Sequence, residues 1–507
     1  MAKNNSLQKK KSGGVLGWIE RVGNKIPHPF ILFLVLMIII AVITFFAKGA
    51  TVVNPSTDEA VSIKSIISGE GLVFALTSMV KNFTGFAPLG LVLSMTLGIG
   101  LAEEVGLMSA FMRRTILGVS AKFVVPVIML IGICGNLASD AAIVIVPTLS
   151  GIIFLYLGRN PIAGVALGYA ATTAGFTANL MIAGTDALLQ GITNQASDII
   201  NGPHIEVTAN WFFMIASTFV ITIAGTLINN YVVEPRVGPY EGTVVVEKSE
   251  VSDEEKRGLK YALIALLVYI AIIVALCVPA TSPLRNPETG SLTTQAPLMK
   301  GIIPIILLMF ISVSIAYGKG AGVIKKASVE VPNIMTKSIA KMSGFIVLAF
   351  IIGQFIAWFN WTNTGEYLAI VLAEALKNAG FTGIPLFIFY ILIVAFINIF
   401  IGSGSAKWAL LAPVFVPMMY LLGYHPAWTQ LLYRLGDSVT NIITPLFPYF
   451  PIILAFMQEY DEEAGAGTLL STMIPYAGIL LFVWIVFMII WYLFVPIPIG
   501  IGGQILI

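Results

Sequence analysis

The sequence predicts an all-α, polytopic membrane protein with about nine transmembrane helices and two re-entrant hairpins in an inverted repeat. Of its 507 residues, 57% are hydrophobic and 11% are charged, and the mean hydropathy is +0.92. A soluble globular protein of this length carries far more charge, so the composition indicates a membrane protein. Apolar runs of roughly 20 residues, the length of a membrane-spanning helix, recur along the chain. Two apolar regions are interrupted by small polar residues, which is typical of hairpins that enter and leave on one side.

The N-terminal segment, residues 1–28, is expected to be cytoplasmic. It carries a lysine run at 9–11 ahead of the first apolar run at 29–47, and basic residues tend to remain on the cytoplasmic side. No small-residue cleavage site follows this run, so we expect a retained first span instead of a signal peptide. The second span is expected at about 87–112, where a basic pair again suits a cytoplasmic exit.

The first hairpin is predicted at about 122–159. Its two apolar arms are each short for a span, and basic residues flank both outer ends, so we expect entry from the cytoplasmic side. The next segment, 161–192, is long and apolar but contains the polar cluster Thr172–Asn179. Glycine and threonine in this cluster indicate an unwound middle, and we therefore expect a broken helix.

A span at about 211–233 completes the first transmembrane half, 29–233. A charged segment at 234–260 contains several prolines and glycines, and we interpret it as a cytoplasmic linker. The second half covers 261–507. Its first elements are expected spans at about 261–278, 297–317 and 342–359 and an amphipathic interfacial segment at 365–380.

The second hairpin is predicted at about 384–422, entering from outside with its tip at Gly402–Ser405. A second broken helix at 426–457 and a ninth span at about 474–495 follow. The two hairpins enter from opposite sides, so the halves have inverted topology, as in many secondary transporters. This architecture predicts a binding site near the midplane of the cell (inner or plasma) membrane, between the two breaks.

The polar break from Gly402 to Trp408 is the strongest indication of function. Irregular backbone at membrane depth survives only where it lines a protein-walled cavity. Arg434, Asp437 and Asn441 are spaced by three and seven residues, so they share one helical face. We expect that face to look at the break.

A charged side chain such as that of Arg434 costs from about 2.5 to above 10 kcal/mol of free energy inside an apolar span. Arg434 must therefore be paired or solvated. Asp437, one turn away, is a possible partner. One interpretation is a structural ion pair, and the other is that Arg434 receives a substrate carboxylate. Lys407 either helps to bind the same anion or extends its charged end toward the membrane surface.

Trp408 either stacks on an aromatic ring of a substrate or serves as an anchor or packing residue. Asp186 lies near the outer end of its span, where it caps a helix, stays solvated or joins the site. Ser403, Gly404 and Ser405 supply oxygens that suit sodium and, at a half-helix start, N–H groups that suit anions. The alternative is a break whose small residues permit close helix packing.

The first half contains a counterpart set of oxygens. If sodium binds, we expect each hairpin tip to contribute ligands, with Asp437 as a further ligand or as a proton carrier. No cofactor is expected beyond sodium or a proton as the coupling ion. The expected ion-binding residues are Asn136, Ser139, Asp140, Thr177, Asn179, Ser403, Gly404, Asp437 and Asn441.

These motifs resemble the AbgT family of p-aminobenzoyl-glutamate transporters. The strings Gly402–Trp408, Arg434–Pro445 and Gly184–Asp186 carry the likeness, which extends over nearly the whole chain. The resemblance implies a homodimer of nine-span protomers that moves p-aminobenzoyl-glutamate with a cation, or exports p-aminobenzoate and sulfonamide antimetabolites. It also implies functional roles for Asp186, Ser405, Trp408, Arg434, Asp437 and Pro445.

The favoured function is secondary active transport of a carboxylated aromatic solute, driven by a sodium or proton gradient. A sodium-coupled dicarboxylate symporter of the same superfamily is the alternative. An intramembrane enzyme is disfavoured, because no histidine lies within a span to act as a base and no His-Glu-x-x-His motif occurs. The net charge of +2 without a basic stripe disfavours a nucleic-acid partner, which leaves lipid and solute as partners.

Overall fold

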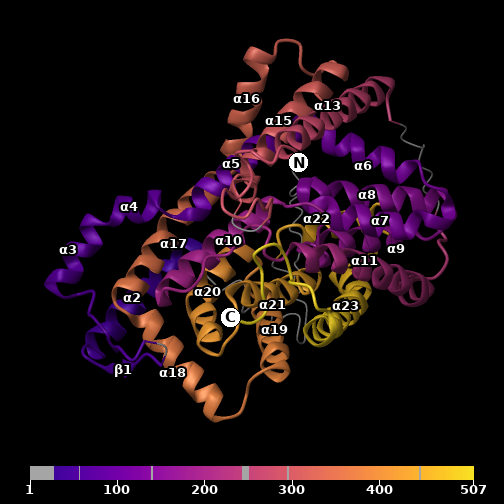
Figure 1. The fold of residues 1–507 in the computed structure, drawn as a ribbon. Helices are drawn as coiled ribbons and strands as arrows, with labels where there is room; N and C mark the ends of the chain where they lie inside the picture. The colour runs from indigo at the N-terminus through magenta and orange to yellow at the C-terminus, as the bar shows by residue number, and fades with distance from the viewer. Residues whose placement is uncertain (1–27, 56, 139–140, 243–250, 294–295, 445–446) are drawn as a thin grey trace, which may run out of the picture.

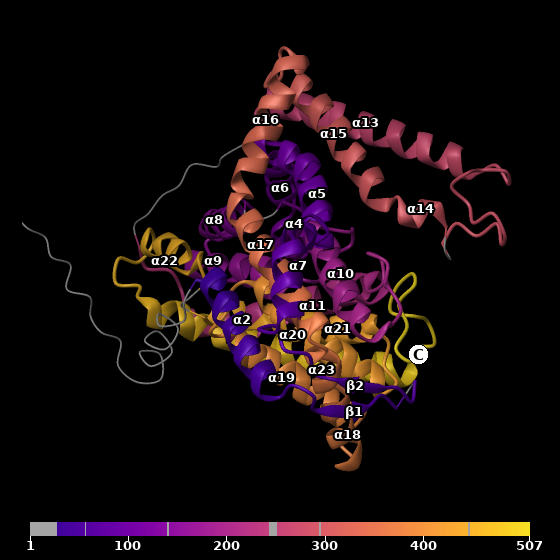
Figure 2. The same ribbon diagram turned by 90° about the vertical axis from the view of Figure 1, so that its left-hand side faces the viewer.

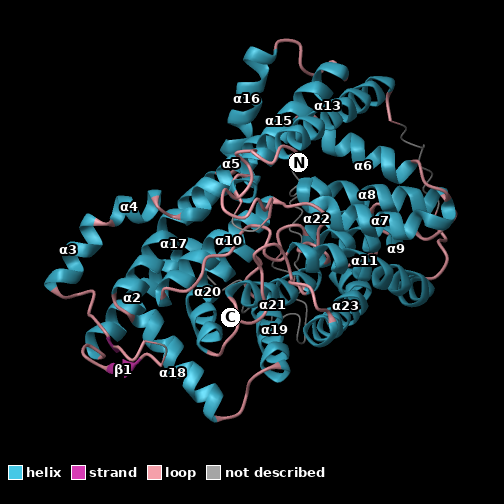
Figure 3. Ribbon diagram, viewed as in Figure 1, coloured by secondary structure: helices cyan, strands magenta, loops and turns pink. Residues whose placement is uncertain are grey.

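The computed structural model describes residues 28–507, apart from residues 56, 139–140, 243–250, 294–295 and 445–446. The predicted N-terminal segment therefore lies almost wholly outside the described residues. The described chain is predominantly helical (Figure 3). Its sheet is one antiparallel pair, in which Val52 of β1 (Thr51–Val53) lies opposite Val61 of β2 (Ala60–Ser62).

The first half contains two hairpin arms and a broken helix. Its helices are α2 (Pro29–Phe46), α3 (Gly69–Thr77), α4 (Met79–Thr84), α5 (Ala87–Glu104), α6 (Leu107–Leu117), α7 (Val124–Ile133), α8 (Ala141–Tyr156), α9 (Pro161–Tyr169), α10 (Gly184–Ser197), α11 (Trp211–Ile228) and α12 (Glu234–Val237). Shorter helical turns are η1 (Ala121–Phe123), η2 (Cys134–Ala138), η3 (Ala170–Ala174), η4 (Asp198–Ile200) and η5 (Asn229–Val233).

The second half has a similar order of hairpin and broken helix. Its helices are α13 (Asp253–Cys277), α14 (Pro297–Lys300), α15 (Ile302–Gly320), α16 (Ala327–Lys341), α17 (Ser343–Trp361), α18 (Thr364–Asn378), α19 (Ile384–Asn398), α20 (Gly404–Leu421), α21 (Pro426–Val439), α22 (Phe450–Gln458) and α23 (Ala466–Phe494). The turn η6 (Asn441–Ile443) follows α21.

Seven helices in the described part of the chain are long and apolar enough to cross a membrane, namely α2, α5, α11, α13, α15, α17 and α23. The broken segments α9–α10 and α21–α22 are the other two of the nine predicted spans, and that they cross the membrane stays a prediction. The paired short helices α7–α8 and α19–α20 correspond to the two predicted hairpins. The predicted all-α, multi-pass fold is thus confirmed.

Both broken helices begin in the same way. Pro161 occupies the first turn of α9 and Pro426 the first turn of α21, where the missing proline N–H costs no helical hydrogen bond. Asn160 caps the first helix and His425 caps the second, each by accepting a backbone N–H with its side chain. The sequence therefore sets the start of each broken helix locally.

The second span is shorter than predicted. α5 ends at Glu104 instead of continuing to about residue 112. Gly106 adopts a left-handed conformation, with φ of 84°, and this stops the helix before α6 begins. α6 and the first hairpin arm then meet at a bend of 117°.

The segment expected as a linker at 234–260 is partly helical. The helical run that starts with α11 continues through η5 and α12 to Val237, and α13 begins at Asp253. Ser252 and Glu255 form a reciprocal cap at this start, each accepting the other's backbone N–H. The basic stretch before the span at 342–359 also contains a helix that the sequence analysis did not predict, α16.

The helices form a central body with one projecting arm. α19, α20, α21 and α10 lie near the centre in Figure 1, and α13–α15 extend away from the other helices in Figure 2. α13 packs against α15, which in turn packs against α5. Over its length α13 buries only Gly258, Ala262 and Cys277, so most of its apolar surface is not covered by the described residues.

Candidate functional site

The candidate site lies where the second hairpin tip meets the two broken helices. α19 ends at Asn398 and α20 begins at Gly404, so the tip between them is non-helical. The Ser403 hydroxyl caps α20 by accepting the Ala406 N–H at 3.4 Å. α20 packs on α10 and on α21, which brings residues from both halves of the chain together.

Arg434 is paired with Asp186. Its Nη2 lies 2.6 Å from Asp186 Oδ1 and also donates to the backbone oxygen of Thr177 at 3.0 Å. Both side chains are almost inaccessible, at 1% and 6% exposure. The pair joins α21 of the second half to the start of α10 in the first half. Asp437, the possible partner of Arg434 in the sequence analysis, instead pairs with Lys407.

Asp186 also caps α10. Its Oδ2 accepts the Ala183 N–H at 2.7 Å and the Asn179 amide at 3.0 Å. The capping and functional interpretations of Asp186 are therefore not exclusive, because one oxygen caps the helix while the other meets Arg434. A solvated carboxylate is the interpretation that the structure rules out.

Lys407 is fully buried and its ammonium lies among oxygens. Nζ is 2.5 Å from Asp437 Oδ1, donates to Asn398 Oδ1 and lies 3.4 Å from the Ile401 carbonyl oxygen. The suggestion that Lys407 extends to the membrane surface is wrong, because Asp437 balances its charge inside the protein. Tyr433 donates to the same Asp437 oxygen at 3.1 Å.

Asn398 connects the hairpin to α21. Its Nδ2 lies 2.6 Å from the Asp437 backbone oxygen, 2.9 Å from Thr440 Oγ1 and 2.8 Å from Asn441 Oδ1. Neither Asn398 nor Tyr433 was identified from the sequence. A single amide within the apolar arm 384–398 was the available signal for Asn398, because polar groups at membrane depth are costly without partners.

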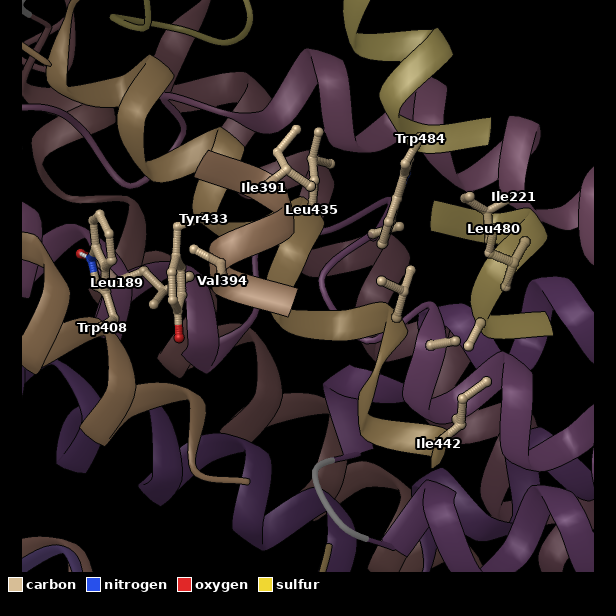
Figure 4. Packing of buried hydrophobic residues seen from close by; sticks show 14 of the residues in the cluster. Leu189, Ile221, Ile391, Val394, Trp408, Tyr433, Leu435, Ile442, Leu480 and Trp484 are labelled. Atoms are coloured by element: carbon tan, nitrogen blue, oxygen red, sulfur yellow. Dashed lines mark hydrogen bonds between the residues drawn. The ribbon is translucent and has the colours of Figure 1, made fainter. Parts of the chain in front are cut away.

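Trp408 is a buried packing residue in this structure. Its ring stacks on that of Tyr433 (Figure 4). The two ring centroids are 4.4 Å apart, and Trp408 Nε1 donates to Thr193 Oγ1 at 3.0 Å. No part of the indole is exposed. A direct stack on a substrate ring would require this packing to open, so the substrate role of Trp408 remains a prediction.

The two unwound segments touch through hydroxyl groups. Thr177 Oγ1 lies 2.6 Å from Ser438 Oγ and 3.1 Å from the Arg434 backbone oxygen. Asn136 in the first hairpin tip donates to the backbone oxygens of Phe176 and Ala178 at 3.0 and 3.2 Å. Two bonded donors fix the orientation of this amide, and its Oδ1 has no partner among the described residues.

The remaining predicted residues are divided between the described chain and its gaps. The hydroxyl oxygens of Ser403 and Ser405 lie 3.3 Å apart. The Gly404 backbone oxygen accepts a hydrogen bond from the Tyr433 hydroxyl at 2.6 Å. Ser139, Asp140 and Pro445 lie outside the described residues. The structure thus gathers Asp186, Thr177, Asn179, Lys407, Arg434, Asp437 and Asn441 around one junction and says nothing of those three.

Oxygen atoms rather than a metal-binding cluster characterise the junction. Among the residues described, no group of three or more His, Cys, Asp or Glu side chains could hold a metal ion. Hydroxyl, amide and carboxylate oxygens suit sodium, which binds oxygen ligands. Asp437, one of the expected ligands, contacts the Lys407 ammonium here.

A cavity of about 360 Å³ approaches the junction from one side. We call it the α5–α10 cavity, because residues of α5 and α10 form two of its walls. Gly184 and Thr185, next to Asp186, line it together with Asn136 and Phe176. At its other end it is lined by Glu103 of α5 and Lys341 of α16.

Comparison with known proteins identifies relatives over nearly the whole chain. The model of the "AbgT putative transporter family" matches residues 14–507. The p-aminobenzoyl-glutamate transport protein of Escherichia coli (strain K12) is 41% identical over 495 residues, which make up 97% of each chain.

Two solved structures share the fold. The YdaH transporter of Alcanivorax borkumensis has a TM-score of 0.89 and 37% identity, covering 94% of this chain and 100% of that one. Neisseria gonorrhoeae MtrF, whose structure is described as illuminating a class of antimetabolite efflux pumps, has a TM-score of 0.90 and 40% identity. The match covers 96% of this chain and 100% of that one. With its fold, its junction of broken helices and its relatives in agreement, this chain belongs to the AbgT transporter family.

Proposed function

We propose that this protein is a secondary active transporter of p-aminobenzoyl-glutamate or related aminobenzoates, driven by a sodium or proton gradient. The name of the Escherichia coli relative supports the substrate class. The description of MtrF supports export of antimetabolites, here p-aminobenzoate and sulfonamides, as a further activity of the same carrier. In this proposal the chain acts as a carrier and performs no catalysis.

The incomplete hydrogen bonding of Arg434 carries the proposal. Its guanidinium is buried at the junction of the two broken helices, yet its Nε has no hydrogen-bond partner among the described residues. A buried donor without a partner is costly, and a carboxylate is the group that an arginine fork binds best. A substrate carboxylate would satisfy Nε while sharing the guanidinium with Asp186.

Coupling would act through the oxygens that surround this arginine. Asp437 is the proposed proton carrier or sodium ligand, because it is buried, carries charge and lies beside the hairpin tip. The proposed sodium ligands of the first half are Asn136, Thr177 and Asn179, with Ser139 and Asp140. Binding at both hairpin tips would link the position of each hairpin to ion occupancy.

The proposed cellular setting follows from the sequence and the family resemblance. The protein would lie in the cell membrane as a homodimer, with its N-terminus in the cytoplasm. Basic residues at 9–11 and 319–341 support this orientation. The largely uncovered α13 face supports either lipid contact or contact with a second copy.

Flux into proteoliposomes tests the proposed function. Wild-type protein should accumulate radiolabelled p-aminobenzoyl-glutamate when a sodium or proton gradient is imposed, and whichever gradient drives uptake names the coupling ion. Asp437→Asn should abolish gradient-driven accumulation, because it removes the carboxylate proposed to carry the proton or ligate sodium. Asp461→Asn, at an exposed loop position, is the matched control and should retain uptake.

Size-exclusion profiles of each variant would confirm that the protein remains folded. Uptake of succinate but not of p-aminobenzoyl-glutamate would favour the dicarboxylate symporter. The proposed coupling would be contradicted if accumulation of p-aminobenzoyl-glutamate did not depend on either gradient, or if it were equal in Asp437→Asn and wild type.

A further inference from the structure

The α5–α10 cavity has a charged end and a buried end. Lys341 at the charged end is 54% exposed, whereas Asn136 at the other end is 7% exposed. Between them Val92, Met95, Ile99 and Leu188 provide an apolar wall. Small-molecule sites typically combine such an apolar wall with a few polar groups in a volume of roughly 300–1,000 Å³.

The buried end contains an unsatisfied acceptor. Both donors of the Asn136 amide are bonded to backbone oxygens, and its Oδ1 has no partner among the described residues. A buried acceptor of this kind is normally satisfied, so either the sodium ion proposed above or a ligand with an N–H or O–H group is a suitable occupant. This atom provides a reason, independent of the charged end, to regard the cavity as a ligand site.

The charged end holds one ammonium between two carboxylates. Lys341 Nζ lies 2.6 Å from Glu104 Oε1 and 3.1 Å from Glu103 Oε1. The hydrogen bond that Lys341 donates to Glu104, ahead of the contribution of Glu103, raises the pKa of Lys341, so the ammonium stays charged at neutral pH. The contact with Glu104 is the shorter of the two, so the longer contact with Glu103 is the more easily exchanged.

We propose that Lys341 binds a carboxylate of the transported anion at the mouth of the α5–α10 cavity, and that Glu103 occupies this ammonium when the anion is absent. The inference rests on the proposed function for the identity of the anion. An entering anion displaces the Glu103 contact, keeps Glu104 as the anchor of Lys341 and places its apolar part along the α5 wall. Lys341 is thus a specificity-determining residue, separate from Arg434.

An exchangeable pair and a structural pair make opposite predictions for mutations. If Glu103 competes with the anion, removing its charge strengthens anion binding, whereas removing the Lys341 charge weakens it. If the pair only stabilises the fold, breaking it from either side has the same effect. Lys337 offers a matched control, because it is 74% exposed, lies 3.9 Å from Glu104 and does not line the cavity.

The test is the KM for p-aminobenzoyl-glutamate uptake in proteoliposomes. Lys341→Gln should raise KM about two- to fivefold, the range for a charged contact partly screened by solvent, and Lys341→Arg should restore it. Glu103→Gln should lower KM about two- to threefold, the gain from removing a weak, solvent-screened competitor. Lys337→Gln should leave KM within about twofold of wild type. A change of the same sign in Glu103→Gln and Lys341→Gln would overturn the inference.

A binding measurement separates this inference from the proposed function. Thermal stabilisation of the purified protein by p-aminobenzoate or succinate needs no transport and no gradient. Stabilisation that is weakened by Lys341→Gln and strengthened by Glu103→Gln would support the carboxylate site even if flux of p-aminobenzoyl-glutamate were absent. A wild-type protein stabilised by neither anion, or variants that respond like wild type, would overturn it.

Discussion

At the scale of single residues, the buried charges of the junction form two pairs with different partners than spacing alone suggests. Arg434 and Asp437 lie one turn apart, but Arg434 meets Asp186 from the first half and Asp437 meets Lys407 from the hairpin. The sequence identified these as the residues that need partners, because charge within apolar segments is costly. It did not identify the partners, since both choices depend on how separate helices pack.

Asp186→Asn should strongly destabilise the protein. The amide keeps an oxygen that can cap α10, but it leaves the Arg434 guanidinium buried without a counter-ion, a change that typically costs about 3–5 kcal/mol. We expect a clear drop in the midpoint of thermal unfolding in detergent. Arg434→Met in the same chain should recover part of the loss, because it removes the stranded charge.

The control is Asp198→Asn, which breaks the pair with His204. Those side chains are 54% and 60% exposed, so the expected cost is at most about 1 kcal/mol. If Asp186→Asn and Asp198→Asn lowered the midpoint of thermal unfolding equally, burial would not determine how much the Arg434–Asp186 pair contributes to stability.

At the scale of elements, hairpins and broken helices were predictable and their junctions only partly so. Polar clusters at Gly402–Ser405 and Thr172–Asn179 marked the breaks, because helix-breaking residues within apolar runs are unusual. The end of α5 at Glu104 escaped prediction, since the left-handed Gly106 lies in a sequence that otherwise continues a helical pattern. The contacts of Asn398 with α21 were not predicted for another reason: a single amide in an apolar sequence does not show which groups it will bond.

Gly436→Ala should loosen the packing of α21 against α19. An added Cβ would lie 2.5 Å from the Ile391 backbone oxygen and 2.7 Å from Val394 Cβ, so the two helices must separate. Overpacking of this kind typically costs about 1–3 kcal/mol, and thermal unfolding should occur at a lower temperature.

Gly478→Ala is the matched comparison. It lies within α23 and has nothing within 4 Å of an added Cβ, so alanine should be neutral or stabilise by up to about 1 kcal/mol. Unchanged stability in Gly436→Ala would mean that α21 and α19 are less closely packed than the structure has them.

At the scale of the whole molecule, the described residues contain seven helices that are long and apolar enough to cross a membrane, and each overlaps a predicted span. Hydropathy was sufficient to predict these seven, because each satisfies a length requirement that packing does not alter. The other two of the nine predicted spans are the broken segments, so chain ends on opposite sides of the membrane stay a prediction. The predicted orientation in the membrane rests on basic residues in the segments 113–122 and 319–341. The projecting arm of α13–α15 was not predictable, because a hydropathy profile does not distinguish a lipid-facing helix from a central one (Figure 2).

Cysteine labelling tests the predicted orientation. In a chain with Cys134→Ala and Cys277→Ala, Glu70→Cys in α3 should react with a membrane-impermeant maleimide in intact cells, because the segment between α2 and α5 is predicted to be external. Lys325→Cys should react only after permeabilisation, because its loop is predicted to be cytoplasmic. Glu70 and Lys325 are both exposed, so burial does not prevent labelling at either position. The opposite pattern would invert the assigned topology.

The pairing of charges at the junction has a consequence for electrical work. Two cationic side chains, Arg434 and Lys407, face two carboxylates, Asp186 and Asp437, so this group is neutral as it stands. A carboxylate that enters adds an uncompensated negative charge in a region of low dielectric constant, where such a charge is costly. Under the proposed coupling, a sodium ion or proton that accompanies each carboxylate would remove this cost. The loaded protein would then change between its inward-open and outward-open states without moving net charge, and the membrane voltage would exert little force on that step.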